Sequence, residues 1–130
     1  MLEMKPEVRS EWCKALRSGE YVQAQGHMRT DPDQNGKVGY CCLGVLTDLY
    51  LKAGNPETYK VPLLPGSDLS VWNNGVLTEP VCEWAGLANS NPLLSKDEEI
   101  VTTAVGANDG GSSFKQIADL IDDGEGKTDV

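Results

Sequence analysis

The sequence has few of the residues on which metal and disulfide chemistry depend. One histidine and four cysteines stand among 130 residues, and no two cysteines have Cys-x-x-Cys spacing. A single imidazole with scattered thiols does not make a zinc ligand set, and four cysteines are too few for a secreted disulfide scaffold of this length. We therefore expect no metal, no cofactor and buried free thiols.

Long apolar runs are also missing. No stretch approaches the roughly 18–20 apolar residues of a membrane span, and the first residues lack the basic and then apolar layout of a secretion signal. We expect no membrane partner and a cytoplasmic location. The chain is long enough for one globular domain with a core, predicted over residues 1–122, followed by a polar, disordered tail over 123–130.

Positive charge is scarce in the second half of the chain. Residues 1–60 carry 8 basic and 8 acidic side chains, whereas residues 61–130 carry 3 basic and 12 acidic ones, for a net charge of -9. Proteins meet nucleic acid backbones with basic patches, so a DNA or RNA polymer is excluded as an ordinary partner. A small anion is compatible with this charge, because backbone amides and one or two arginines hold it locally.

Helical periodicity marks several segments. Residues 6–18 begin with Pro6 and stop at Gly19, and the run from 41 to 53 contains Gly44, where we expect close backbone packing. A short helix is predicted from the Thr78 cap to Gly86. The last helix is predicted after a capping box of Ser113 and Gln116, whereas residues 55–77 are expected to be mostly loop and 95–106 fit helix or strand.

Residues 20–30 alternate between two rows, as a half-buried strand does, and "KVGYC" is expected to return as its partner. Between them, Asp31, Asp33 and Asn35-Gly36 match the start of a calcium loop. Its last ligand position holds Cys42, a soft thiol, and Asn-Gly strongly favours a turn, so we interpret this segment as a turn. The predicted fold is α+β, with helices packed on a small antiparallel sheet in a single compact domain.

The polar row of that strand is the first candidate site. It holds Tyr21, Gln23, Gln25, His27 and Arg29, which together offer an aromatic platform, two amides, an imidazole and a guanidinium. This set suits a nucleotide-like ligand, because tyrosine stacks on a ring, amides pair with base or ribose, and arginine meets phosphate. A solvated outer strand face is the alternative.

Two further segments are candidates. "ANDGGSSF", residues 107–114, is predicted to be a loop before a helix, where Asn108 and Asp109 orient ribose hydroxyls and the amides near Ser112 and Ser113 bind phosphate. An ordinary helix cap is the alternative. Trp72 in "VWNNG" is a stacking surface if exposed and a core residue if buried.

The chain is poorly equipped as an enzyme. His27 is the only side chain whose ordinary pKa lies near neutrality, and no catalytic signature accompanies it. We assign no catalytic residue, with His27 the one to test if turnover occurs. Binding is favoured over catalysis.

Four segments carry a family resemblance: "GEYVQAQGHMR", "YCCLGVLTDLY", "VCEWAGL" and "ANDGGSSFKQIADLI". Together they resemble a family of small phage and prophage accessory proteins with a Cys-Cys-Leu-Gly-Val-Leu helix and an Asn-Asp-Gly-x-Ser-Phe-x-x-Ile-Ala-Asp ending. This chain departs from the pattern by the doubled glycine at 110–111. The resemblance implies an accessory protein acting in the cytoplasm of a bacterial host.

Compact phage proteins of this size include sponges that sequester nucleotide signals of host immunity. By that analogy we expect a phage anti-defence protein that binds a cyclic ADP-ribose type signal or a cyclic dinucleotide and that forms a homo-oligomer. A small phosphodiesterase and an acidic inhibitor of a host protein are the alternatives. The expected ligand-binding residues are Tyr21, Gln23, His27, Arg29, Trp72, Asn108, Asp109, Ser112 and Ser113.

Overall fold

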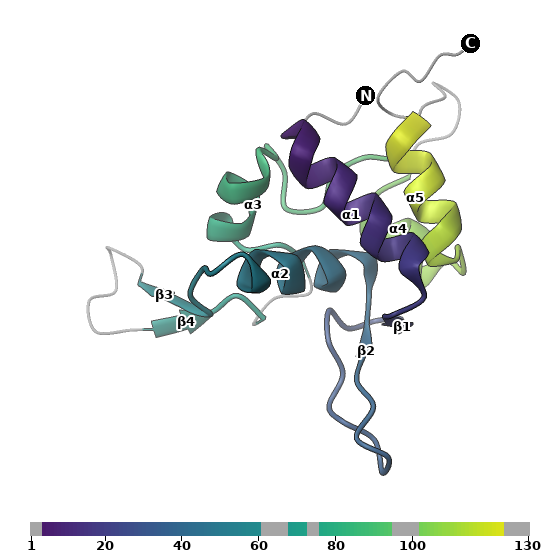
Figure 1. Cartoon of the computed structure of the whole chain (residues 1–130), viewed down its shortest axis with the longest axis horizontal. Helices are drawn as coiled ribbons and strands as arrows, with labels where there is room; N and C mark the ends of the chain where they lie inside the picture. Colours follow the sequence, from purple (N-terminus) through teal and green to yellow (C-terminus); the bar gives the residue numbers. More distant parts are fainter. Residues whose placement is uncertain (1–3, 61–67, 73–75, 95–101, 124–130) are drawn as a thin grey trace.

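The computed structural model describes residues 4–60, 68–72, 76–94 and 102–123, and it confirms the predicted α+β class (Figure 1). The elements in chain order are α1 (Pro6–Ser18), β1 (Val22–Gln23), β2 (Gly39–Tyr40), α2 (Cys42–Lys52), β3 (Thr58–Lys60), β4 (Asp68–Ser70), α3 (Glu79–Ala85), α4 (Ala104–Asp109) and α5 (Phe114–Asp123). Beyond the helical Asp123, the tail predicted to be disordered lies outside the described residues.

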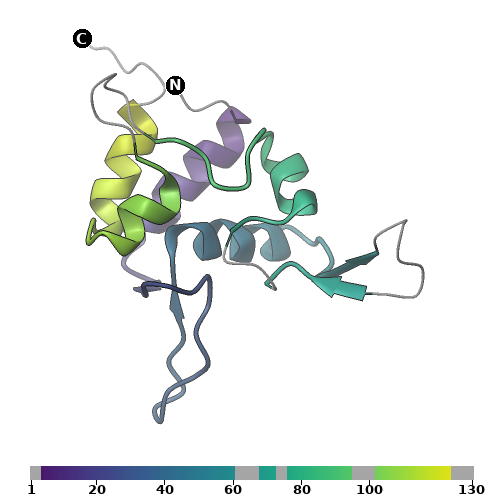
Figure 2. The ribbon, with the colours of Figure 1, turned by 180° about the vertical axis from the view of Figure 1, so that it is seen from behind.

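The helices form the body of the molecule, and the β segments extend from it in two directions (Figure 1). α1 packs on both α2 and α5, and α3 packs on α2. Seen from behind, α4 lies beside α5 and close to the start of α2 (Figure 2). No helix in the described part of the chain is long and apolar enough to cross a membrane.

The first helix is confirmed with its predicted bounds. Val8, Trp12 and Leu16 are buried along one face, which is the spacing that an amphipathic helix requires. Gly19 ends the helix in the left-handed conformation with φ 80°, which costs glycine little. The Trp12 indole Nε1 donates a hydrogen bond of 2.9 Å to the carbonyl of Cys42, so α1 is fastened to the first turn of α2.

The second helix is also confirmed, and its glycine has the predicted role. A Cβ on Gly44 would lie 1.8 Å from the carbonyl oxygen of Met28. The backbone at Met28 therefore packs directly against the backbone of α2 at Gly44. Cys41 and Cys42 are buried free thiols, as predicted.

The predicted capping box of the last helix is present. The Ser113 amide donates to Gln116 Oε1 at 2.8 Å, and the Gln116 amide donates to Ser113 Oγ at 3.1 Å. The loop predicted within residues 107–114 is wrong in its first part, because α4 continues through Asp109. Thr103 caps that helix by accepting a hydrogen bond of 3.0 Å from the Gly106 amide. This local helix signal outweighs the glycine-rich composition, which predicted a loop.

The strand predicted over 20–30 is mostly wrong. Only β1 is strand, and Gly26, with φ 82°, turns the chain soon after it. β2 does return beside it, pairing with β1 in parallel, while Tyr40 also forms an antiparallel bridge with Arg29. Tertiary contacts override the alternation: Val22 is 50% exposed, whereas its polar neighbour Gln23 is half-buried.

The segment that resembles a calcium loop is a turn, as predicted. The carboxylate of Asp33 accepts hydrogen bonds from the amides of Asn35, at 2.8 Å, and Lys37, at 2.9 Å. Gly36 adopts φ 79°, and its amide bonds to the Asp33 carbonyl at 2.9 Å. Within the described ranges, no group of three His, Cys, Asp or Glu side chains could hold a metal ion.

The segment predicted to be mostly loop contains a hairpin. β3 and β4 pair antiparallel, with Tyr59 opposite Leu69. α3 follows as predicted and ends at Gly86, but the Thr78 side chain makes no capping bond. Of the ambiguous 95–106 segment, residues 95–101 lie outside the described residues, Thr103 bridges to Leu93, and α4 begins at Ala104.

Candidate functional site

Trp72 lies in the turn after β4, and Arg29 covers its ring. The guanidinium carbon Cζ is 4.1 Å from the ring centroid, which is a close cation–π contact. The Arg29 side chain is exposed, and no carboxylate of the described residues forms an ion pair with it. Its N–H groups therefore remain available to an anion while the guanidinium lies over the indole.

The Trp72 indole nitrogen does not hold the ring in place. Nε1 is buried and has no hydrogen-bond partner among the described residues. A buried unsatisfied donor costs about 1–3 kcal/mol. Within the described part of the chain, the ring is therefore held by its packing against the core and by Arg29, and not by an indole hydrogen bond.

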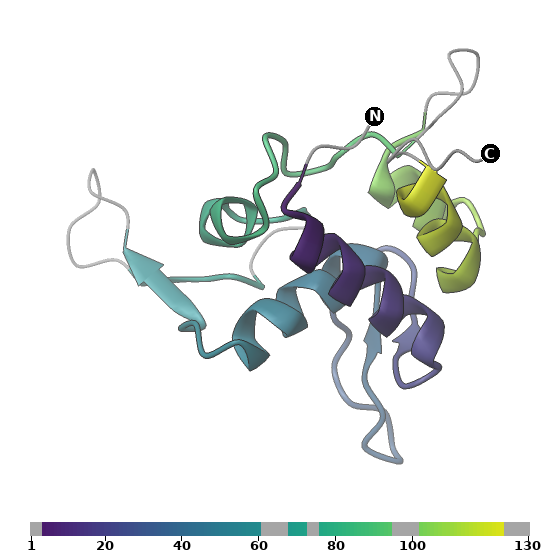
Figure 3. The same ribbon diagram turned by 45° about the horizontal axis from the view of Figure 1, so that its top comes forward.

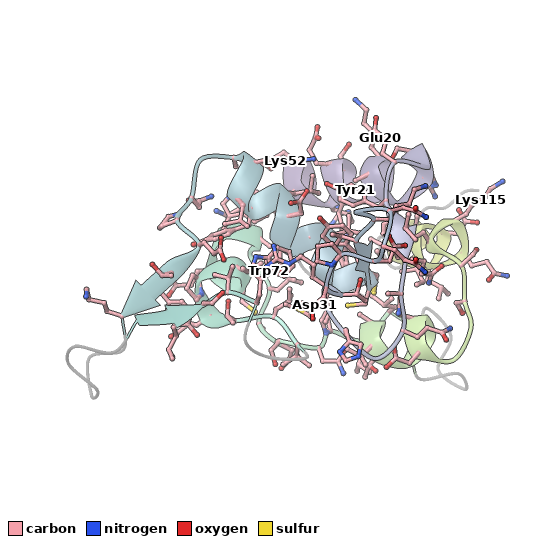
Figure 4. All side chains as sticks on the ribbon, turned by 90° about the horizontal axis from the view of Figure 1, so that it is seen from below. Glu20, Tyr21, Asp31, Lys52, Trp72 and Lys115 are labelled. Carbon is pink, nitrogen blue, oxygen red and sulfur yellow. The ribbon has the colours of Figure 1, made fainter. Side chains whose placement is uncertain are left out.

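Trp72 is half-buried and packs against the core, and two half-buried tyrosines continue from it. Tyr40, on β2, lies 6.1 Å from the Trp72 ring at an interplanar angle of 53°, and Tyr21 meets Tyr40 edge to face at 5.2 Å and 88°. These are favourable aromatic geometries. We call Tyr21, Tyr40 and Trp72 the aromatic row; Figure 4 shows Tyr21, Lys52 and Trp72 in one region of the molecule seen from below.

The far end of the aromatic row is anchored to α2. The Tyr21 hydroxyl donates to Asp48 Oδ2 at 2.5 Å and accepts from Lys52 Nζ at 3.1 Å. Lys52 and Asp48 also form an ion pair at 3.2 Å, one turn apart on the helix. The charge of Lys52 is thus largely engaged within the protein, in contrast to that of Arg29.

Burial and these contacts shift the pKa values of Tyr21, Tyr40 and Lys52. Burial, followed by the hydrogen bond to Asp48, raises the pKa of Tyr21. Burial raises the pKa of Tyr40 as well. The hydrogen bonds to Tyr21 and then Asp48 raise the pKa of Lys52 above its usual range. Both phenols therefore stay neutral and Lys52 stays charged at physiological pH.

A second cluster is built around the side chain of Asn108. Its Oδ1 accepts from Gln23 Nε2 at 3.0 Å and from the Cys42 amide at 3.2 Å. Its Nδ2 donates to the Ala24 carbonyl at 2.7 Å and to Asp109 Oδ1 at 3.2 Å. The hydrogen bonds of this amide join three parts of the chain. Asn108 is also fully buried, so it presents no surface to a ligand.

Neighbouring residues reinforce this connection. Gln23 Nε2 also donates to the Ser112 carbonyl at 2.7 Å, and the Gly26 amide donates to Asp109 Oδ1 at 2.9 Å. Gln25 Nε2 donates to the Asn108 carbonyl at 3.3 Å. The side-chain amides of Gln23 and Gln25 thus hold β1 and the residues after it against the end of α4 and the turn that leads to α5.

The structure divides the predicted site residues into two groups. Tyr21, Arg29 and Trp72 meet along the aromatic row, although Trp72 is distant from the other two in the sequence. Gln23, Asn108, Asp109 and Ser112 meet in the cluster around Asn108. Ser113 caps α5, and His27 is exposed.

Sequence reasoning missed three residues of the site. Asp48 and Lys52 have the i,i+4 acidic-to-basic spacing that stabilises a helix, so their ion pair was visible in the sequence. Nothing in the sequence linked that pair to Tyr21. Tyr40 gave no signal of its own, because its place between two aromatic rings depends on the return of β2.

The model of one protein family matches residues 4–125, nearly the whole chain; that family is described as "Domain of unknown function (DUF8296)". No curated protein and no solved structure matches the chain.

Proposed function

The chain belongs to the family described as Domain of unknown function (DUF8296), and we propose that it is a non-enzymatic binder of a small, nucleotide-derived anion. The observation that carries this proposal is the contact of Arg29 with Trp72, at 4.1 Å from ring centroid to guanidinium carbon. An exposed guanidinium that lies over an indole, with no carboxylate partner among the described residues, offers two ligand contacts in one place. We assign base recognition to the aromatic row and phosphate recognition to the Arg29 guanidinium.

The rest of the aromatic row supports the same ligand class. Tyr40 extends the aromatic surface beyond Trp72, and Tyr21 extends it again toward α2. Stacking on aromatic side chains contributes about 1–3 kcal/mol per base. Because the chain carries a net charge of -9, a phosphate-bearing ligand needs a local cation, and Arg29 is the one that the row supplies without a carboxylate partner in the described residues.

The biological role in this proposal rests on the resemblance to phage and prophage accessory proteins. In that role the protein acts against host defence by sequestering an immune signal, a cyclic dinucleotide or a cyclic ADP-ribose type molecule, in the bacterial cytoplasm. Such ligands combine planar bases with phosphates, which is the combination that the aromatic row and Arg29 suit. Gln23, Asn108, Asp109 and Ser112 then position the site and do not contact the ligand.

Incubation with a panel of cyclic dinucleotides and cyclic ADP-ribose isomers tests the proposal. After removal of unbound ligand, the protein is heated and the released molecules are identified by mass spectrometry. We expect one ligand class to be depleted from solution and returned intact. Arg29→Gln should weaken its binding at least tenfold, whereas Lys115→Gln, which removes the same charge at an exposed site on α5, should change it less than twofold.

The other outcomes separate the alternatives. A linear product would make the protein a phosphodiesterase, and His27→Ala would then be the first variant to assay. If no member of the panel is depleted, the small-molecule proposal is wrong. Equal losses in Arg29→Gln and Lys115→Gln would show that binding depends on total charge and not on the aromatic row.

A further inference from the structure

A groove follows α1 where this helix meets α2 and the end of α3. Its larger part has a volume of about 490 Å³, and its apolar surface comes from Val8, Leu49, Ala53 and the half-buried Trp84. α3 is held beside the start of α1 by a backbone hydrogen bond of 2.8 Å from the Lys5 amide to the Ala85 carbonyl. Figure 3 shows α1 alongside α2, with α3 beyond the start of α1.

The groove continues toward Tyr21. A second hollow of about 190 Å³ shares Glu11, Leu49 and Lys52 with the first one, so the two adjoin. Their lining on α1 extends from Glu7 to Ser18, about 16 Å along the helix axis at 1.5 Å per residue. An occupant of this length is an elongated segment and not a single small ion.

The rim of the groove carries a net negative charge, with three carboxylates and two lysines. Glu7 and Glu11 lie one turn apart on α1, both exposed, and no cation of the described residues pairs with either. Glu20 adds a third carboxylate at the far end. Lys14 and Lys52 also line the groove, but the charge of Lys52 is engaged by an ion pair within α2. Adjacent carboxylates at i,i+4 repel each other, so a cation between them is favoured.

We propose that this groove is a docking site for a basic amphipathic helix of a partner protein. Apolar side chains at i, i+3, i+4 and i+7 of that helix would pack on Leu49 and Trp84, as in other helix-in-groove interfaces. Its lysines or arginines would face Glu7 and Glu11 across the rim. This function is additional to ligand binding on the aromatic row, although the two surfaces meet at Tyr21 and Lys52.

Fluorescence polarisation with a labelled peptide tests the proposal. The probe is a helical peptide of about 14 residues, with leucines on one face and lysines and arginines flanking them. We expect a dissociation constant in the micromolar range. A peptide of the same composition with scrambled order, which destroys the apolar face, should bind at least tenfold more weakly.

Two variant pairs distinguish docking from general attraction to an acidic protein. Glu7→Gln/Glu11→Gln removes two charges from the rim, and Glu57→Gln/Glu83→Gln removes two from exposed positions that do not line the groove. The first pair should weaken binding about tenfold and the second less than twofold. Ala53→Trp should fill the groove and weaken binding more than tenfold with all charges retained, while circular dichroism confirms the fold.

Several results would overturn the proposal. These are equal losses in the two variant pairs, equal binding of the scrambled peptide, or no binding at all. Displacement of the peptide by an equal concentration of spermidine would make a free organic cation the occupant. A concentration-dependent dimer that Ala53→Trp abolishes would make the occupant a second copy of the chain.

Discussion

The carbonyl oxygen of Met28 lies so close to the Cα of Gly44 that a Cβ at this position would come within 1.8 Å of it. The Cys41 amide donates to the same carbonyl at 3.2 Å, so the segment before β2 is held against the first turn of α2. Arg29 follows Met28 directly. The position of the guanidinium on Trp72 therefore depends on a glycine inside a helix.

Gly44→Ala tests this dependence. The overlap is with backbone, which cannot move aside as a flexible side chain can, so we expect the free energy of unfolding to fall by about 3 kcal/mol or more. Gly19→Ala is the comparison, because its Cβ would meet nothing within 4 Å and only its φ of 80° is unfavourable. That variant should lose about 1 kcal/mol. Urea unfolding measures both, and equal losses would contradict the steric explanation.

Asn108→Asp should destabilise the protein in a pH-dependent way. The carboxylate cannot donate to the Ala24 carbonyl, and burial raises the pKa of an aspartate above its unfolded value of about 3.9. We expect a loss of about 3 kcal/mol at pH 7 that becomes smaller as the pH falls and the carboxyl group is protonated. Asn35→Asp, in the exposed turn, should change stability by less than about 0.5 kcal/mol. A loss independent of pH would contradict this prediction.

Tyr21→Phe should affect stability most clearly in alkaline solution. The variant lacks the hydroxyl that donates to Asp48, and a loss of about 1 kcal/mol is expected at pH 8. The pKa of Tyr21 is raised in the folded state, so its contribution is complete below about pH 10 and is lost as the pH rises through the folded-state value. The wild type should therefore lose stability faster than the variant above pH 10. Parallel curves, measured by chemical denaturation at each pH, would contradict the assignment.

The thiols should differ in reactivity as they differ in burial. Cys13, Cys41 and Cys42 are buried, and burial raises the pKa of Cys41 and Cys42, whereas Cys82 is only half-buried. A thiol reagent at pH 8 should label Cys82 alone in the native protein, and slowly, because burial and the nearby Glu79 raise its pKa too. Cys82→Ser should abolish native labelling, and all four thiols of the wild type should react in guanidinium chloride. Rapid labelling of Cys82→Ser would contradict the assigned burial.

Local sequence signals determined most of the helices. Pro6 and Gly19 delimit α1, Gly86 ends α3, and the capping box of Ser113 and Gln116 begins α5; each acts through contacts within a few residues. Such contacts do not depend on the rest of the chain, so they can be read without it. The strand prediction failed for the opposite reason. Gln23 and Gln25 turn toward α4, more than 80 residues away, and that attachment outweighs the alternation of the sequence.

The features of the candidate site also fall into those that the sequence determined and those that depended on tertiary contacts. The sequence by itself determined which side-chain chemistry was present: the rings of Tyr21 and Trp72 and the guanidinium of Arg29, in a chain with a net charge of -9. Only the tertiary structure decided that Tyr40 links Tyr21 to Trp72 and that Arg29 covers the Trp72 ring. It also decided that Asn108 is a buried structural amide. The physical reason is that a side chain's type is local, whereas its neighbours and its burial depend on how β2, α2 and α4 pack.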